Sequence, residues 1–165
     1  MVTLTPGFTG PAKLAGHAGR RLETILLATD LTPASSAATE QAIDLAVRLE
    51  AHLLVVTVME SARAGAGRRG ARPEARAARA RDAQRVVHEA RAAGAEARFL
   101  VWEGDAGPGI VAAAESEGAD IIVVGTHRRG SVGRFLLGSV SDHVVHRADC
   151  AVLVVRPATE DVPTD

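Results

Sequence analysis

Two apolar runs near the C-terminal end constrain the fold of this chain more than any other feature. The first, Ile121–Val124, follows Asp120 and stops at Gly125, and the second is Ala151–Val155. Short continuous runs of valine, isoleucine and leucine are typical of strands buried on both faces, as in a parallel sheet. A loop with glycine, hydroxyl and cationic side chains, and then a predicted helix, separate the two runs. A loop of this kind before a helix N-terminus is a place for an anion.

The first half of the chain predicts a strand, a helix and a second strand. Apolar residues dominate Leu22–Thr29 and His52–Met59, where the strands are expected. Thr32 is expected to cap the helix between them, with Pro33 in its first turn, where the missing N–H costs nothing. The apolar residues at helical spacing, expected to form one buried stripe, are Ala38, Ala42, Leu45, Ala46 and Leu49.

The alternation of strands and helices continues along the chain. A second helix is predicted over Pro73–Ala93, ending before Gly94, and a third strand over Ala97–Trp102. A short third helix precedes Asp120, and its expected core residues are Ile110, Val111 and Ala114. The order of five strands and four helices predicts an α/β fold with an open parallel sheet and helices on both faces.

The length of 165 residues suits one domain with its own core. We expect this domain over residues 21–157, with 1–20 as a flexible arm and 158–165 as a polar tail, because neither end has a periodic apolar pattern. The net charge is −1, so the whole chain has no general attraction to nucleic acids or anionic membranes.

Cysteine and apolar content predict the cellular compartment. Cys150 is the single cysteine, expected at the start of the last strand as a small buried residue, and an internal disulfide is therefore excluded. No apolar run approaches the roughly 18 residues of a membrane-spanning helix. The N-terminal segment also lacks the apolar core of a secretory signal. The cytoplasm is the expected location, with no membrane span.

The segment 61–91 is rich in arginine, with nine arginines and three acidic residues between Arg63 and Arg91. It is either a nucleic-acid surface or a basic loop followed by a solvated helix face. The second interpretation is favoured because no aromatic residues interleave for base stacking. We therefore expect no nucleic-acid partner.

The stretch from Gly125 to Val155 resembles the universal stress protein family. The family signature is glycine, two residues, glycine, nine residues, glycine, then serine or threonine. Here Gly125 is the first glycine, Gly138-Ser139 is the last pair, and Arg128 stands at the middle glycine. The resemblance implies a Rossmann-like sheet with strand order 3-2-1-4-5. It also implies ATP binding where that order reverses, between the first and fourth strands, at their carboxyl ends.

The expected nucleotide contacts come from three loops and one helix N-terminus. They are Ala28, Thr29, Asp30, Val58, Gly125, Thr126, His127, Arg128, Gly138, Ser139, Val140 and Ser141. The helix N-terminus at Ser139–Ser141 offers amide groups and hydroxyls to phosphates. By resemblance, Asp30 accepts from the ribose or adenine region and Val58 offers backbone groups to the base.

Structural roles remain open for several of these residues. Asp30 could cap the first helix and the serines could cap the fourth, while His127 is interpreted as a loop residue rather than a catalytic base. Arg128 either strains the loop or brings a cation to the phosphates.

The resemblance predicts a regulatory nucleotide-binding protein. ATP is the expected ligand, with magnesium held mainly by its phosphates, and ADP or AMP as alternatives. A homodimer is expected through the last strand, Cys150 to Val155, together with a regulatory protein partner. The alternatives are a nucleotide-free interaction protein and, least favoured, a slow ATPase. No catalytic residues and no protein metal ligands are predicted.

Overall fold

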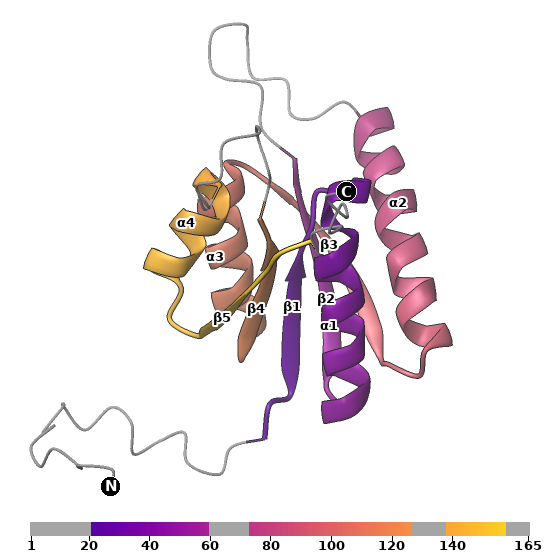
Figure 1. Cartoon of the computed structure of the whole chain (residues 1–165). Helices are drawn as coiled ribbons and strands as arrows, with labels where there is room; N and C mark the ends of the chain where they lie inside the picture. The colour runs from indigo at the N-terminus through magenta and orange to yellow at the C-terminus, as the bar shows by residue number, and fades with distance from the viewer. Residues whose placement is uncertain (1–20, 60–72, 127–137, 158–165) are drawn as a thin grey trace, which may run out of the picture.

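The computed structural model describes residues 21–59, 73–126 and 138–157. In these parts of the chain, parallel strands form a sheet in the order β3-β2-β1-β4-β5 (Figure 1). The strands are β1 (Thr24–Ala28), β2 (His52–Met59), β3 (Ala97–Glu103), β4 (Ile121–Gly125) and β5 (Ala151–Val155). The predicted fold class and strand order are confirmed. The predicted arm and tail, residues 1–20 and 158–165, lie outside the described residues.

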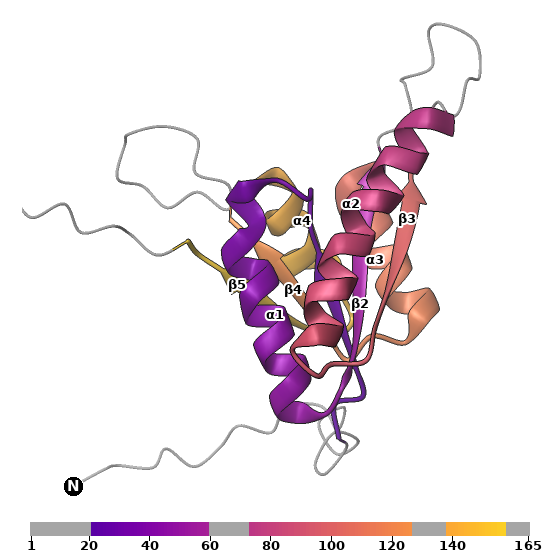
Figure 2. The same ribbon diagram turned by 90° about the vertical axis from the view of Figure 1, so that its right-hand side faces the viewer.

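Helices cover both faces of the sheet (Figures 1 and 2). On one face lie α1 (Ser36–Leu49) and α2 (Pro73–Ala92), and on the other lie α3 (Ala106–Glu117) and α4 (Ser139–Arg147). A short 3-10 helix, η2 (Pro33–Ser35), precedes α1. Among the described residues, no helix has the length and apolar character needed to cross a bilayer.

The core consists of two apolar clusters, one on each face of the sheet. Successive residues of a strand point to opposite faces. Ile25 and Leu27 therefore join the cluster beneath α1 and α2, whereas Leu26 joins the cluster beneath α3 and α4. All three side chains are fully buried. The continuous apolar runs of the sequence thus correspond to strands covered on both sides.

The first strand is shorter than the predicted Leu22–Thr29. At its amino end, the backbone N–H groups of Glu23 and Thr24 donate to Asp120 Oδ2, at 2.8 and 3.0 Å. Beyond its carboxyl end, the chain turns at Leu31, whose φ is 63°. The Asp120 carboxylate at one end and the left-handed Leu31 beyond the other therefore limit β1. The apolar pattern of the sequence cannot predict either of them.

The first helical segment begins where predicted, with Thr32 as the N-cap residue and Pro33 in first position, but this first turn is the 3-10 helix η2. Thr32 makes no side-chain cap bond, because its hydroxyl donates to Asp30 Oδ1 (2.8 Å), and α1 begins after η2. Leu49, predicted in the buried stripe, is 37% exposed. It is the last residue of α1, beside left-handed Glu50 (φ 52°), where the chain turns toward β2. The fully buried members of the stripe are Ala38, Ala42 and Ala46.

The second and third helices lie close to their predicted ranges. α2 ends just before Gly94, whose φ of 100° favours glycine. In α3, Ile110 and Ala114 are buried and Val111 is half-buried against the core, as predicted. The third strand runs one residue beyond its predicted end, to Glu103.

The burial difference between two leucines gives a stability prediction. Leu27→Ala should lower the free energy of unfolding by about 2–5 kcal/mol, because it leaves a cavity beneath α1 and α2. Leu49→Ala, the matched control at the exposed helix end, should change it by less than about 1 kcal/mol. Urea unfolding followed by circular dichroism measures both. Equal losses would contradict the packing described here.

Candidate functional site

The carboxyl ends of β1 and β4 lie side by side at one end of the sheet, which we call its carboxyl edge (Figure 1). Ala28 of β1 is in register with Val124 of β4 on one side and with Val56 of β2 on the other. The chain leaves β1 toward β2 and returns much later to β4, so the strand order reverses at this point. Ligands of open α/β sheets bind at such positions.

A tightly bonded loop follows β1. Leu31 has the left-handed φ of 63°, a conformation that costs a non-glycine residue about 1–2 kcal/mol. Two side chains hold this turn: Thr29 Oγ1 accepts from the Leu31 N–H (3.0 Å), and Asp30 Oδ1 accepts from the Thr32 N–H (3.0 Å). Thr29 also bonds the hydroxyl of Ser35 (2.8 Å). The loop is therefore held in one conformation beside β4.

Arg79 of α2 also holds this loop. Its Nη1 donates to the backbone carbonyl of Asp30 at 2.5 Å. This contact was not predicted, because Arg79 is one of several arginines at irregular spacing and nothing in the sequence distinguishes it. It brings a guanidinium to the edge of the sheet where an anionic ligand is expected.

All five arginines of α2 donate to acceptors within the described chain. Arg76 pairs with Glu103, Arg85 bonds Asp82, and the others bond backbone carbonyls. These bonds favour the interpretation of α2 as an ordinary helix face rather than a nucleic-acid surface, because its arginines bond to acceptors of the protein itself. The rest of the arginine-rich segment, 60–72, lies outside the described residues.

The N-terminus of α4 faces the same edge of the sheet. Its N-cap residue is Gly138, which has no side chain to cap the helix. Ser141, 3% exposed, donates its hydroxyl hydrogen to the Gly125 carbonyl (3.0 Å), which fastens the first turn of α4 to the end of β4. Ser139 is exposed and Val140 half-buried. The first-turn amides carry the positive end of the helix dipole.

Strand β2 extends beyond the end of β1 and leaves a short free edge. Residues of a strand alternate in the direction of their backbone groups. The Val56 carbonyl accepts from the Thr29 N–H (3.0 Å), so the N–H and carbonyl of Val58 point the same way. Among the described residues, no backbone hydrogen bond continues this ladder to Val58. A donor and an acceptor side by side match the hydrogen-bonding edge of a base.

The structure brings most of the predicted site residues to one edge, with some changes in what they offer. Ala28 and Thr29 are buried, and the Thr29 hydroxyl is already bonded. The predicted phosphate contact of the Ser141 hydroxyl needs correction, because its hydrogen goes to Gly125. Thr126 donates its N–H to the Val155 carbonyl (2.9 Å). His127 and Arg128 lie outside the described residues.

Cys150 differs from its prediction. It lies one residue before β5 and is half-buried rather than buried. Burial raises the pKa of the Cys150 thiol, and the nearby carboxylates of Asp120 and Asp149 raise it further. A thiol with a raised pKa stays protonated and is a poor nucleophile.

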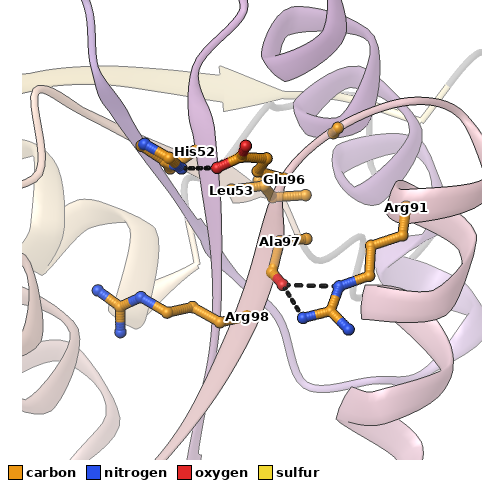
Figure 3. A pocket seen from close by; sticks show the side chains of 7 residues that line it. His52, Leu53, Arg91, Glu96, Ala97 and Arg98 are labelled. Atoms are coloured by element: carbon orange, nitrogen blue, oxygen red, sulfur yellow. Dashed lines mark hydrogen bonds and ion pairs between the residues drawn. The ribbon is translucent and has the colours of Figure 1, made fainter.

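A hollow of about 480 Å³ lies at the opposite end of the sheet, where β2 and β3 begin (Figure 3). Arg91 donates twice to the Ala97 carbonyl (3.0 and 2.7 Å), and His52 Nδ1 lies 2.9 Å from Glu96 Oε2. The side chains of His52 and Glu96 are 64% and 82% exposed. The lining residues are His52, Leu53, Arg91, Ala95, Glu96, Ala97 and Arg98. Its charged groups are partnered and open to solvent, so it is a weaker candidate site.

Comparison with known proteins identifies the family. The model of the universal stress protein family matches residues 21–156. The chain belongs to the universal stress protein family. The family resemblance predicted from the Gly125–Val155 stretch is thereby confirmed.

Individual relatives agree with this assignment. A universal stress protein from Methanothermobacter thermautotrophicus is 48% identical over 59 residues, which are 36% of this chain and 40% of that protein. The alignment thus spans well under two thirds of the relative's length.

Solved structures of the family cover more of the chain. Universal stress protein UspA from Lactobacillus plantarum is 27% identical, with a TM-score of 0.68, over 83% of this chain and 99% of that one. A universal stress protein solved in complex with cAMP is 26% identical, with a TM-score of 0.63, over 84% of this chain and 100% of that one.

The two serines of α4 should separate folding from ligand contacts. Ser141→Ala removes the bond to Gly125 and should lower the free energy of unfolding by about 1–2 kcal/mol. Ser139→Ala, at an exposed position, should change it by less than about 0.5 kcal/mol. Urea titration of the two variants measures the difference. A larger loss for Ser139→Ala would show that the roles of the two serines are reversed.

Proposed function

We propose that this universal stress protein binds an adenine nucleotide, ATP foremost, at the carboxyl edge of β1 and β4. It would act as a regulatory module whose ligand state influences a protein partner or a dimer. The observation that carries the proposal is the N-terminus of α4, whose N-cap residue is a glycine and which Ser141 ties to the end of β4, next to β1 and its Asp30 loop. A family relative solved with cAMP supports a ligand of the adenine nucleotide class.

The glycines at the phosphate end support this proposal. Gly138 has φ −62° and ψ 155°, which any residue can adopt. A Cβ on Gly125 would lie 3.5 Å from the Cβ of Ala38, an ordinary contact. At neither position does the backbone conformation explain the glycine, and Gly125 is not needed to avoid Ala38. Room for a phosphate near the backbone is a consistent reason for both.

The base and ribose would lie toward β2. The N–H and carbonyl of Val58, which have no backbone partner among the described residues, suit the N1 and N6 groups of adenine, which accept and donate respectively. Asp30 follows β1, which lies between β2 and β4 in the sheet, and its carboxylate bonds Thr32. We assign it to the ribose. Arg79 holds the Asp30 carbonyl and adds positive charge on the same side.

Magnesium would arrive with the phosphates. Within the described ranges, no group of three or more His, Cys, Asp or Glu residues is suited to hold a metal. The ATP phosphates would supply most of its ligands. ADP and AMP share the base and ribose contacts, so they remain alternative ligands. The predicted cytoplasmic location also stays a prediction.

Calorimetric titration of ATP into the full chain tests the proposed ligand. ATP should bind, and Gly138→Val should abolish binding without unfolding the protein, because valine tolerates the Gly138 backbone angles. Ser139→Ala should weaken binding by about tenfold, the loss of one hydrogen bond to a charged group.

Arg128→Gly decides between the nucleotide-binding protein and its nucleotide-free alternative. If arginine contributes charge to the phosphates, the variant should bind ATP more weakly. Wild-type protein that binds no ATP or ADP at millimolar concentration, together with an Arg128→Gly variant that does, would contradict the proposed function.

A homodimer through β5 is also proposed. β5 is at the edge of the sheet and pairs with β4 on one side. Its residues Val152–Val155 are only half-buried and carry no charge or proline, devices that commonly protect an edge strand. Antiparallel pairing of two such edges about a two-fold axis would close on itself.

Charge on the β5 edge should separate the subunits. Val152→Lys should shift the protein from dimer to monomer in sedimentation at micromolar concentration, because a lysine would oppose strand pairing. Val47→Lys on α1, where valine is 38% exposed, is the matched control and should remain dimeric. A monomeric wild-type protein would refute the dimer.

A further inference from the structure

The first turn of α3 contains two buried glycines that face opposite ways. Gly107 and Gly109 are two residues apart, which corresponds to about 200° around a helix. One faces α4 and the other faces the ends of β2 and β3. This turn therefore lies between the two ends of the proposed nucleotide site.

Gly107 is in close contact with His143 of α4. A Cβ on Gly107 would lie 2.8 Å from Cγ and 2.9 Å from Cβ of His143. These atoms are at the base of the side chain, so a rotation of the ring does not relieve both contacts. The next residue, Val144, is fully buried in the core. A larger residue at position 107 must therefore displace α4 itself, together with its N-terminal amides.

Gly109 has the corresponding contact on the other side. A Cβ there would lie 2.9 Å from Cδ1 of Trp102 and 3.3 Å from Cγ1 of Val58. Trp102 and Val58 are in register across β2 and β3. Both pack on the face covered by α3 and α4. Adding a methyl group at Gly109 must therefore displace the indole of Trp102, which lies next to Val58 and its free edge.

We propose that Gly107 and Gly109 are positioning residues that set the two ends of the nucleotide site separately. Gly107 lets His143 and α4 approach, and so places the amides that bind phosphates. Gly109 lets Trp102 approach, and so places the residues beside the base. This inference rests on the proposed function, and it adds that α3, which supplies none of the expected contacts, determines the relative affinities for nucleoside and nucleotide.

Titrations of ATP and adenosine into the full chain test this division. Gly107→Ala should weaken ATP binding by about tenfold, since phosphate hydrogen bonds are lost, and leave adenosine affinity within about twofold. Gly109→Ala should weaken ATP and adenosine by the same factor. It should also alter the change in fluorescence on adenosine binding, because Trp102 is the only tryptophan.

Two further variants separate positioning from loss of stability. Ala112→Gly lowers the helix propensity of α3 without adding an atom to either contact, and should leave the ratio of the two affinities unchanged. The double variant Gly107→Ala/His143→Ala removes the Cγ and Cδ2 contacts and should recover part of the ATP affinity. A general defect in folding predicts no such recovery.

The outcomes distinguish this inference from the function on which it rests. Wild-type protein that binds neither ligand overturns the proposed function, and the inference falls with it. Wild-type binding combined with equal losses of ATP and adenosine affinity in Gly107→Ala overturns the inference alone. So does an unchanged affinity for both ligands in both glycine variants.

Discussion

The placement of β1 between β2 and β4 is the constraint on which the rest of the structure depends. Both edges of β1 are hydrogen-bonded, and its side chains are buried on both faces. It therefore joins β2, from the first half of the chain, to β4, from the second half. Because β1 stops at Ala28 while β2 continues to Met59, the same strand also leaves the free edge at Val58.

The candidate site is built mainly from backbone groups. The hydroxyls of Thr29, Ser35 and Ser141 bond to other groups of the protein. Among the described residues, what they leave for a ligand is the first turn of α4 and the Val58 edge. Hydrogen bonds from fixed backbone groups need little reorganisation when a ligand binds, because the side-chain bonds already hold the loops.

Much of this fold could be predicted from the sequence, because the strands are apolar runs and the helices start or end at residues such as Pro73 and Gly94. The strand order came from the family signature, since hydrophobic periodicity does not specify which strands pair. The late start of α1 was missed because the competing bonds of Asp30 and Thr32 are local polar contacts.

The structure brings most of the predicted site residues to one end of the sheet, but the hydrogen bonds of individual residues differ from those expected. Spacing within the Gly125–Ser139 motif cannot show that the Ser141 hydroxyl bonds Gly125. The contacts of Arg79, His143 and Trp102 join residues far apart in the sequence. Such contacts depend on how the helices pack, and no short motif encodes them.

The bond from Arg79 to Asp30 has a consequence for how this site can evolve. The guanidinium binds the backbone carbonyl of residue 30 and not its carboxylate. Every amino acid has that carbonyl, so the support given by α2 is independent of the side chain it holds in place. A change of the side chain at position 30 would therefore remove its bonds to Thr32 and could alter the preferred ligand, while the bond from Arg79 to the backbone is kept.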